Sequence, residues 1–250
     1  MLKQALAIAQ RAGDIIKSRV PRTVQSKVGN DIVTAVDLEA EKYITRELGK
    51  HFPNHAIFSE EDNRLVPHAK YLWVVDPLDG TVNFTSGIPL YSVSIGLLVN
   101  GRPVLGVVHA PAMKETFFAE VKKGAFLNNN KISVSKTNRL TEAVISGGVA
   151  PHFKKSQMEK AITLLSDIVP YVRGVRIFES GALIKCYVAC GRVDAHLGVK
   201  TDPFGSAASK VIIEEAGGVI SDFHGKSWSL EMRTLACSNK KLHAKILSFV

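Results

Sequence analysis

The pattern of apolar segments changes part-way along the chain, and this change constrains the fold more than any other feature of the sequence. Three apolar segments between residues 91 and 121 have the length and spacing of strands, and the first two are joined by Asn100-Gly101, a dipeptide typical of tight hairpin turns. From Ala143 onward, strand-like segments alternate with helical patterns. The sequence therefore predicts an antiparallel meander followed by an α/β arrangement.

Helical patterns come before the meander. Residues 1–19 place their apolar side chains on one helical face, and Pro21 predicts the end of that helix. Residues 23–30 are mostly polar and contain a Gly-Asn pair, which predicts a mobile loop. A second helix is expected from about Thr34, as its N-cap, to Gly49.

The two patterns predict two halves. We expect a mixed α+β and α/β protein, with an N-terminal half over residues 1–139 that carries the antiparallel sheet and a C-terminal α/β half over residues 140–250. The strands expected in the second half lie near Val144 and Val175 and over 193–197 and 219–221. One helix expected there ends at Ile168, and two others span 182–189 and 204–216.

Composition and charge narrow the class of protein. The 250 residues are 46% hydrophobic, as in an ordinary globular protein, and the net charge of +9 favours anionic partners, although the basic residues are scattered. The three cysteines lack the spacing of a disulfide framework. No apolar run approaches the roughly 20 residues that a membrane span needs. The N-terminus also lacks a signal-peptide core, so we expect a cytoplasmic protein without a membrane partner.

Two aspartates mark the end of a short strand predicted over residues 71–76. Pro77 keeps Asp76 extended, and Asp79 follows after a tight turn. Gly80-Thr81 then opens a short helix, whose first amides can bind an anion. Such a strand end offers oxygen ligands for a hard divalent cation beside a site for phosphate. From these residues alone, the alternative is that both aspartates are only turn or cap residues.

Two further acids favour the metal interpretation. Glu60 ends a predicted strand over 56–60, and Asp202 precedes a predicted helix of the other half. Isolated acids are usually solvated, so neither residue decides the question by itself. The sequence contains neither a Gly-rich Lys loop for nucleotide phosphates nor a Gly-x-Ser-x-Gly nucleophile motif.

Several motifs occur in an order that resembles the inositol monophosphatase family, part of the lithium-sensitive, magnesium-dependent phosphatase superfamily that includes fructose-1,6-bisphosphatase. The run Asp-Pro-Leu-Asp-Gly-Thr-Val-Asn-Phe at 76–84 resembles the central signature of that family. The other matching segments are Lys27 with 31–37, 59–61, 202–208 and 214–218. The resemblance covers almost the whole chain and implies a layered αβαβα sandwich of the sugar phosphatase type.

The resemblance implies Mg²⁺ as the cofactor, with two to three ions. Glu60, Asp76 and the carbonyl of Leu78 would hold the first ion. Asp76, Asp79 and Asp202 would hold the second, and Glu60 would share a weaker third. Only oxygen ligands are involved, as a hard cation requires.

The resemblance also implies catalytic and phosphate-binding roles. Thr81, polarised by Asp37, would orient and deprotonate a water molecule, with Glu60 as the third catalytic residue. The amides of Gly80 and Thr81 would hold the phosphate. Lys27 would lie near the metal-site loop.

The segment that normally contacts the polyol departs from the family pattern. Glu179 stands beside Ser180 where the family has glycine, and we expect both to contact the substrate. Arg176 and Lys200 are candidates for binding a second phosphate. The alternative is that these charged residues lie on the surface and are only solvated. The segment before Asp202 is also short and lacks the glutamate that contacts inositol, as in archaeal members that hydrolyse both inositol phosphates and fructose bisphosphate.

The expected function is that of a phosphoric monoester hydrolase acting on a small polyol- or sugar-phosphate such as inositol 1-phosphate. Other candidate substrates are fructose 1,6-bisphosphate, histidinol phosphate, NADP and 3′-phosphoadenosine phosphate. The family resemblance implies a homodimer. A basic RNA- or transcription-complex-binding protein is the alternative of another class, and the complete ligand set disfavours it as the sole function. His109 and His196 match no catalytic position of the family and are expected to be structural.

Overall fold

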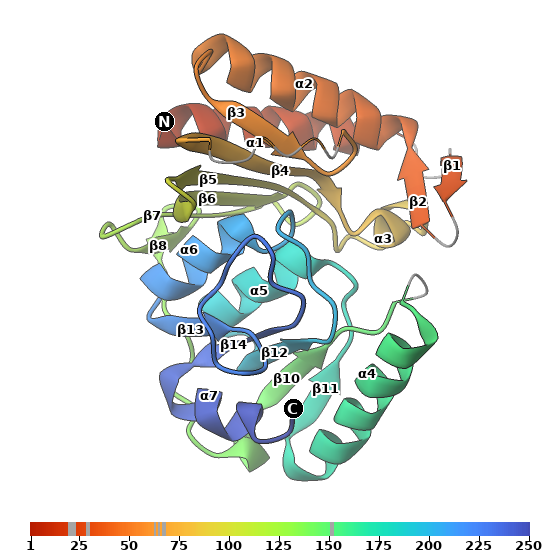
Figure 1. Cartoon of the computed structure of the whole chain (residues 1–250), viewed down its shortest axis with the longest axis vertical. Coiled ribbons are helices and arrows are strands. Elements are labelled where there is room, and N and C mark those ends of the chain that lie inside the picture. The colour runs from red at the N-terminus through yellow and green to blue at the C-terminus, as the bar shows by residue number, and fades with distance from the viewer. Residues whose placement is uncertain (20–23, 29–30, 63, 65, 67–68, 151–152) are drawn as a thin grey trace.

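Helices and sheets alternate in five layers in the computed structural model (Figure 1), which describes residues 1–19, 24–28, 31–62, 64, 66, 69–150 and 153–250 and, for 24–28 and 31–33, the backbone only. From top to bottom in that view, α1 and α2 cover the first sheet, α5 and α6 lie between the two sheets, and α4 and α7 cover the second sheet. The expected αβαβα sandwich is therefore confirmed. The helices are α1 (Leu2–Lys17), α2 (Ala35–His51), α3 (Thr81–Thr85), α4 (Lys155–Ile168), α5 (Gly181–Ala189), α6 (Ala207–Glu215) and α7 (Lys240–Leu247).

The first sheet contains the predicted meander. Its strands run in the order β3-β4-β5-β6-β7-β8-β9, with β3 parallel to β4 and every later pair antiparallel. Asn100 and Gly101 join β5 to β6 with φ angles of 50° and 75°, as a type I′ hairpin turn requires. The strands are β3 (Ala56–Ser59), β4 (Tyr71–Asp79), β5 (Ser92–Val99), β6 (Arg102–Ala110), β7 (Glu115–Glu120), β8 (Ala125–Leu127) and β9 (Asn130–Lys131).

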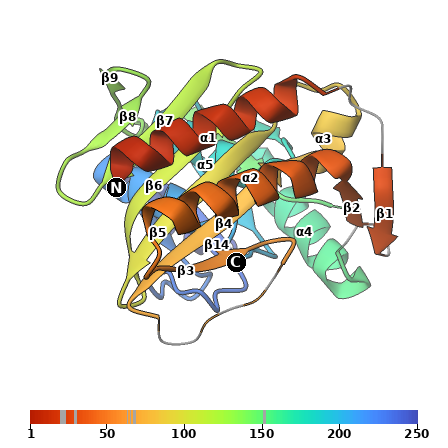
Figure 2. The same ribbon diagram turned by 90° about the horizontal axis from the view of Figure 1, so that it is seen from above.

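Helices α1 and α2 lie side by side across the outer face of this sheet (Figure 2). Helix α2 begins at the predicted cap, because the Thr34 hydroxyl accepts hydrogen bonds from the amides of Val36 and Asp37 while the Asp37 carboxylate accepts one from the Thr34 amide. This capping box also fixes the position of Asp37. Pro21 lies outside the described residues.

The expected loop over residues 23–30 is wrong for most of its length. Residues 24–28 form β1 (Val24–Val28), which pairs antiparallel with β2 (Asp31–Thr34). The polar composition suggested a loop, but β-branched residues at Val24, Val28, Ile32 and Val33 favour strands on both sides of the Gly-Asn pair.

The second sheet follows the predicted alternation of strands and helices. Its order is β11-β10-β12-β14-β13, in which β10 pairs parallel with β11 and β12, and β14 pairs antiparallel with β12 and β13. The strands are β10 (Val144–Gly147), β11 (Gly174–Arg176), β12 (Ala195–Gly198), β13 (Gly218–Ser221) and β14 (Leu235–Asn239). The division of the chain at residue 139 stays a prediction, because the core around α5 and α6 includes side chains from both sheets.

Two glycines let α6 lie very close to the first sheet. A Cβ atom at Gly106 would lie 2.1 Å from the Ala208 carbonyl oxygen, and one at Gly96 would lie 2.9 Å from the Ala208 amide nitrogen. The close packing also positions the loop that precedes α6, where the Ser94 hydroxyl donates to the Phe204 carbonyl at 3.0 Å. As a result, Phe204 lies against β5 at Ser94, the residue that pairs with Asp76 on β4.

Among the described residues, no helix combines the length and the apolar character needed to cross a bilayer.

Candidate active site

A bulge at the end of β4 presents the two central aspartates. Asp76 pairs with Ser94 and Asp79 with Ser92, so β4 has one more residue than β5 across this interval. Pro77 lies in the bulge, a position in a sheet at which proline is tolerated because its missing amide is not needed for pairing. The strand thus continues to Asp79, three residues beyond its predicted end. Gly80 then turns the chain into α3 with a φ of 88°.

Asp79 caps a helix from the other half of the chain. Its carboxylate accepts hydrogen bonds from the Gly181 amide at 2.6 Å, the Ala182 amide at 3.0 Å and the Ser180 hydroxyl at 2.5 Å, all at the start of α5. The Ser92 hydroxyl adds a fourth at 3.0 Å. Burial raises the pKa of Asp79, and the Ser180 hydroxyl and the Lys185 ammonium oppose that rise.

Asp76 and Glu60 form the acidic core of the site. Burial and the charge of Glu60 raise the pKa of Asp76 well above its ordinary value. Desolvation by the surrounding protein and the charge of Asp202 do the same for Glu60, even though the Glu60 side chain has surface open to the cavity. Three carboxylates from separate segments therefore lie close enough to repel one another.

These acids line a single cavity of about 220 Å³ between the two halves. Within the described residues, no three Asp, Glu, His or Cys side chains converge on one point as a formed metal site, since Asp79 is turned toward α5 and Asp202 accepts the Gly205 amide at 2.8 Å. The donor set nevertheless fits a hard divalent cation, because it is made of oxygen atoms only and carries crowded negative charge that a cation would relieve. Leu78, whose carbonyl is a predicted ligand, also lines the cavity.

Thr81 and Asp37 are in contact. The Thr81 hydroxyl lies 3.1 Å from the Asp37 carboxylate and 3.0 Å from the Leu78 carbonyl, and it can donate to either oxygen. Asp37 is buried behind Thr81, which itself lines the cavity. Burial raises the pKa of Asp37, and hydrogen bonds from Thr34 and Thr81 oppose the rise. The predicted catalytic roles of this pair stay predictions.

The predicted substrate residues divide into two groups. Gly80, Glu179 and Ser180 line the cavity, and Glu179 has a φ of 49°, a left-handed conformation that is uncommon for residues other than glycine. Arg176 lies outside the cavity lining, where its guanidinium donates to the Val175 carbonyl at 2.9 Å. The side chain of Lys27 lies outside the described part of the chain.

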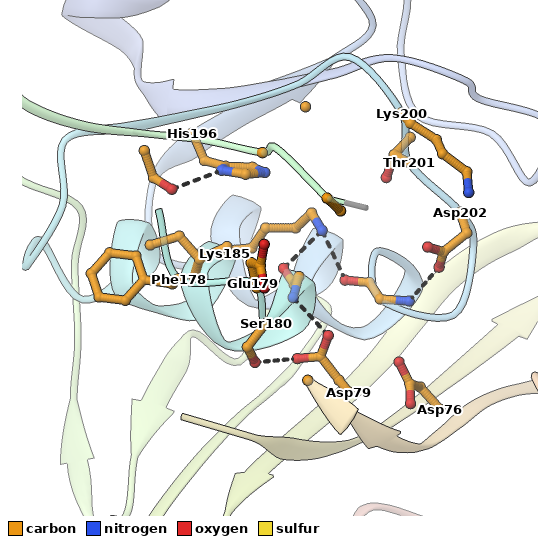
Figure 3. A pocket seen from close by; sticks show the side chains of 18 of the residues that line it. Asp76, Asp79, Phe178, Glu179, Ser180, Lys185, His196, Lys200, Thr201 and Asp202 are labelled. Atoms are coloured by element: carbon orange, nitrogen blue, oxygen red, sulfur yellow. Dashed lines mark hydrogen bonds between the residues drawn. The ribbon is translucent and has the colours of Figure 1, made fainter. Parts of the chain in front are cut away.

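His109 and His196 lie at different distances from the cavity. His109 is buried beside Thr116, away from the cavity, with 2.9 Å between the imidazole Nδ1 and the hydroxyl. His196 lines the cavity wall, with its Nδ1 3.3 Å from the Ser146 hydroxyl oxygen (Figure 3). Burial and the nearby Lys185 charge lower the pKa of His196 to about 3, so its imidazole is neutral at physiological pH.

Lys185 is a site residue that the sequence analysis missed. It is 3% exposed, lies on α5 in the wall of the cavity, and donates to the carbonyls of Gly181 and Gly205 (Figure 3). The only available signal was a lysine in the otherwise apolar 182–189 segment. Lysine is almost never fully buried unless its charge is compensated, so a lysine in an apolar helix indicates compensating groups nearby in the fold.

Comparisons with known proteins agree with this arrangement. A profile of the inositol monophosphatase family matches residues 1–250. A fructose-1,6-bisphosphatase/inositol-1-monophosphatase of Thermotoga maritima is 38% identical over 228 residues, 91% of this chain and 86% of that protein. The Nus factor SuhB of Pseudomonas aeruginosa is 35% identical over 260 residues, 100% of this chain and 95% of that protein.

A solved structure extends the similarity to the fold. The extragenic suppressor protein SuhB of Bartonella henselae matches with a TM-score of 0.93 and 32% identity, covering 99% of this chain and 96% of that one. The similarity therefore covers the whole chain, in sequence and in the five-layered fold alike. On these grounds the chain belongs to the inositol monophosphatase family, whose members are generally metal-dependent, and it is a phosphatase that hydrolyses phosphate monoesters.

Proposed function

We propose that this enzyme hydrolyses a small polyol- or sugar-phosphate monoester with two to three Mg²⁺ ions held by Glu60, Asp76, Asp79, Asp202 and the Leu78 carbonyl. The observation that carries the proposal is that all five residues line one cavity although they come from three separate parts of the chain. Bound Mg²⁺ would neutralise these carboxylates and make the attacking water more acidic.

The residues of the chain have separate tasks in this proposal. The Thr81 hydroxyl, held by buried Asp37, orients the attacking water, and Glu60 assists in taking its proton. The amides of Gly80 and Thr81 lie at the start of α3 and bind the phosphate oxygens. The protein thus contributes positions and charges rather than a covalent nucleophile.

The wall opposite the acids suits the alcohol part of the substrate. Glu179 offers a carboxylate to hydroxyl groups, and the neutral imidazole of His196 offers a further polar contact. Lys200 is exposed in the same cavity and would favour a second phosphate, as in fructose 1,6-bisphosphate. The Thermotoga relative is named for both activities, which supports a substrate range wider than inositol phosphate.

A substrate panel tests the proposal. Phosphate release would be measured with inositol 1-phosphate, fructose 1,6-bisphosphate, histidinol phosphate, NADP and 3′-phosphoadenosine phosphate, with Mg²⁺, without it and with added Li⁺. We expect fastest turnover on a monophosphate of a polyol or sugar, dependence on Mg²⁺ and inhibition by Li⁺. No release from any of these compounds would contradict the proposal.

A second role in RNA or transcription-complex binding is the alternative of another class. The net charge of +9 and the Nus factor names of several relatives favour it. Retention of RNA that weakens steeply with salt would support this role, and no retention at low salt would remove it. A homodimer and a cytoplasmic location complete the proposal, and light scattering and cell fractionation test them.

A further inference from the structure

The buried position of Lys185 is unusual for its place in a helix. It lies in the second turn of α5, and its ammonium turns back toward the helix N-terminus to reach the Gly181 carbonyl at 2.8 Å. The N-terminus of a helix carries partial positive charge, so a cation there is unfavourable unless negative charge lies nearby. Burial of the ammonium adds a desolvation cost. Something in the cavity therefore compensates this charge.

The charge of the Lys185 ammonium is compensated by two backbone carbonyl dipoles and by the carboxylates of Asp79 and Asp202 beyond them. One peptide group links Lys185 to Asp79: the Gly181 carbonyl accepts from the ammonium, and the Ala182 amide of the same peptide donates to Asp79 at 3.0 Å. At Gly205, the carbonyl accepts from Lys185 at 3.2 Å while the amide donates to Asp202 at 2.8 Å. The ammonium is thus joined to both carboxylates through the backbone, without a direct ion pair to any described carboxylate.

The charge of Lys185 also acts across space. A methyl group at Gly181 would lie 3.5 Å from both the Asp79 carboxylate and the Lys185 nitrogen, so the two charged groups lie close to the same point. Any divalent ion bound to Asp79 would experience the ammonium as a like charge in a poorly solvated environment.

Building on the proposed metal centre, we propose that Lys185 is a resident cation of the acidic site. Its ammonium holds the Gly181–Ala182 peptide that contacts Asp79 and the carbonyl of Gly205, whose amide contacts Asp202, and its charge weakens the affinity of the carboxylates for divalent ions. Lys185 is therefore a positioning residue that sets the Mg²⁺ concentration at which the site fills.

Three substitutions separate charge from hydrogen bonding. Lys185→Met removes both, Lys185→Gln keeps donors without charge, and Lys185→Arg keeps the charge. Lys210→Met is the matched control, because Lys210 lies on α6 outside the cavity lining and pairs with Glu214. Circular dichroism verifies that each variant is folded, and the Gln and Arg variants still decide the question if the Met variant does not fold.

The main measurement is titration of the metal-free proteins with Mg²⁺ alone, by calorimetry at fixed ionic strength. We expect the Met and Gln variants to bind Mg²⁺ roughly tenfold more tightly than the wild type, and the Arg variant and the Lys210 control to stay within about twofold. Thermal unfolding should show a lower Tm for the neutral variants in chelator and a larger rise on adding Mg²⁺.

The alternative outcomes are distinct. Wild-type or weaker Mg²⁺ affinity in the Met and Gln variants would overturn the resident-cation role and leave the proposed function in place. Lower Tm in all three variants with unchanged Mg²⁺ affinity would reduce Lys185 to a purely structural residue. No Mg²⁺ binding by the wild type would overturn the metal centre and this inference together.

Discussion

The two walls of the cavity hold their charges in opposite ways. The wall formed by the ends of β3 and β4 carries Glu60 and Asp76, whose pKa values are raised by burial and by the neighbouring carboxylates. The wall formed by α5 and the loop before α6 carries hydrogen-bond donors, among them the amides of Gly181 and Gly205 and the ammonium of Lys185. The acids of the first wall lie close to other acids, whereas Asp202, the acid on the loop before α6, accepts a hydrogen bond from the Gly205 amide. Each wall is stabilised by the other, so the site exists only where the two halves meet.

Asp79 belongs to both walls, and its substitution should have the largest effect. Asp79→Asn keeps an acceptor for the α5 amides but removes the negative charge proposed to bind metal. We expect turnover to fall by roughly a thousandfold or more, in the range seen when a key electrostatic group of a site is removed. The free energy of unfolding should fall by only about 1 kcal/mol, as for a weakened helix cap.

Phosphate release and chemical denaturation measure these two effects. Asp167→Asn, at an exposed position on α4, is the matched control and should change neither. Near-full turnover by Asp79→Asn would show that Asp79 is a helix cap alone.

Substitution of Thr81 tests the role of a hydroxyl group on the acidic wall. Thr81→Ala removes the hydroxyl that contacts Asp37, and we expect kcat to fall by about a hundredfold, as for the loss of a group that assists proton transfer. Thr81→Ser should recover most of the rate. The control is Thr85→Ala, also on α3, whose hydroxyl donates to the Val82 carbonyl and lies outside the cavity lining. Equal rates for the Ala and Ser variants would contradict the role of the hydroxyl.

The crowded acids predict how stability depends on pH without metal. Raised pKa values mean that the folded protein binds more protons than the unfolded chain, so stability should fall as pH rises from about 4 through the raised values. We expect the free energy of unfolding in chelator to be roughly 1–3 kcal/mol lower at pH 8 than at pH 5.

Denaturant titrations with and without Mg²⁺ measure this dependence. Added Mg²⁺ should reduce the loss at pH 8, and Asp76→Asn should flatten the profile in chelator. A metal-free protein that gains stability over this range would contradict the proximity of these carboxylates.

Substitution of Glu179, on the opposite wall, should have the smallest effect on activity. Its φ of 49° suits glycine better, so Glu179→Gly should raise the free energy of unfolding by up to about 1 kcal/mol. The KM for a polyol monophosphate should rise several-fold because a hydroxyl acceptor is lost. Lys114→Gly is the matched control, since Lys114 has a φ of 56° and lies outside the cavity lining. It should gain stability with an unchanged KM, and an unchanged KM in Glu179→Gly as well would remove Glu179 from the substrate site.

Local signals in the sequence predicted much of the fold. The N-cap at Thr34 and the hairpin turn at Asn100-Gly101 depend on residues a few positions apart, and both are present in the structure. The β1–β2 hairpin was missed because polar residues obscured its β-branched pattern. The meander and the later α/β alternation were predicted because each depends on short repeating patterns.

The site residues that were predicted from the sequence are those that lie within short motifs. Asp76, Asp79 and Thr81 lie in one short run, and Glu60 and Asp202 each lie in a separate matching motif, so the resemblance identified all of them. The capping of α5 by Asp79 joins residues about a hundred positions apart and has no local signature. Lys185 was missed for the same reason, because its partners are backbone carbonyls that only the packed fold brings to it.

The proposed function requires that acids from both halves of the chain bind divalent ions in one cavity. Crystals grown with Mn²⁺, a probe that is visible by anomalous scattering, and with phosphate test this claim most directly. We expect two or more anomalous peaks within bonding distance of Glu60, Asp76, Asp79 and Asp202, with phosphate beside Gly80 and Thr81. Peaks located elsewhere, or no peak among these four carboxylates, would contradict it.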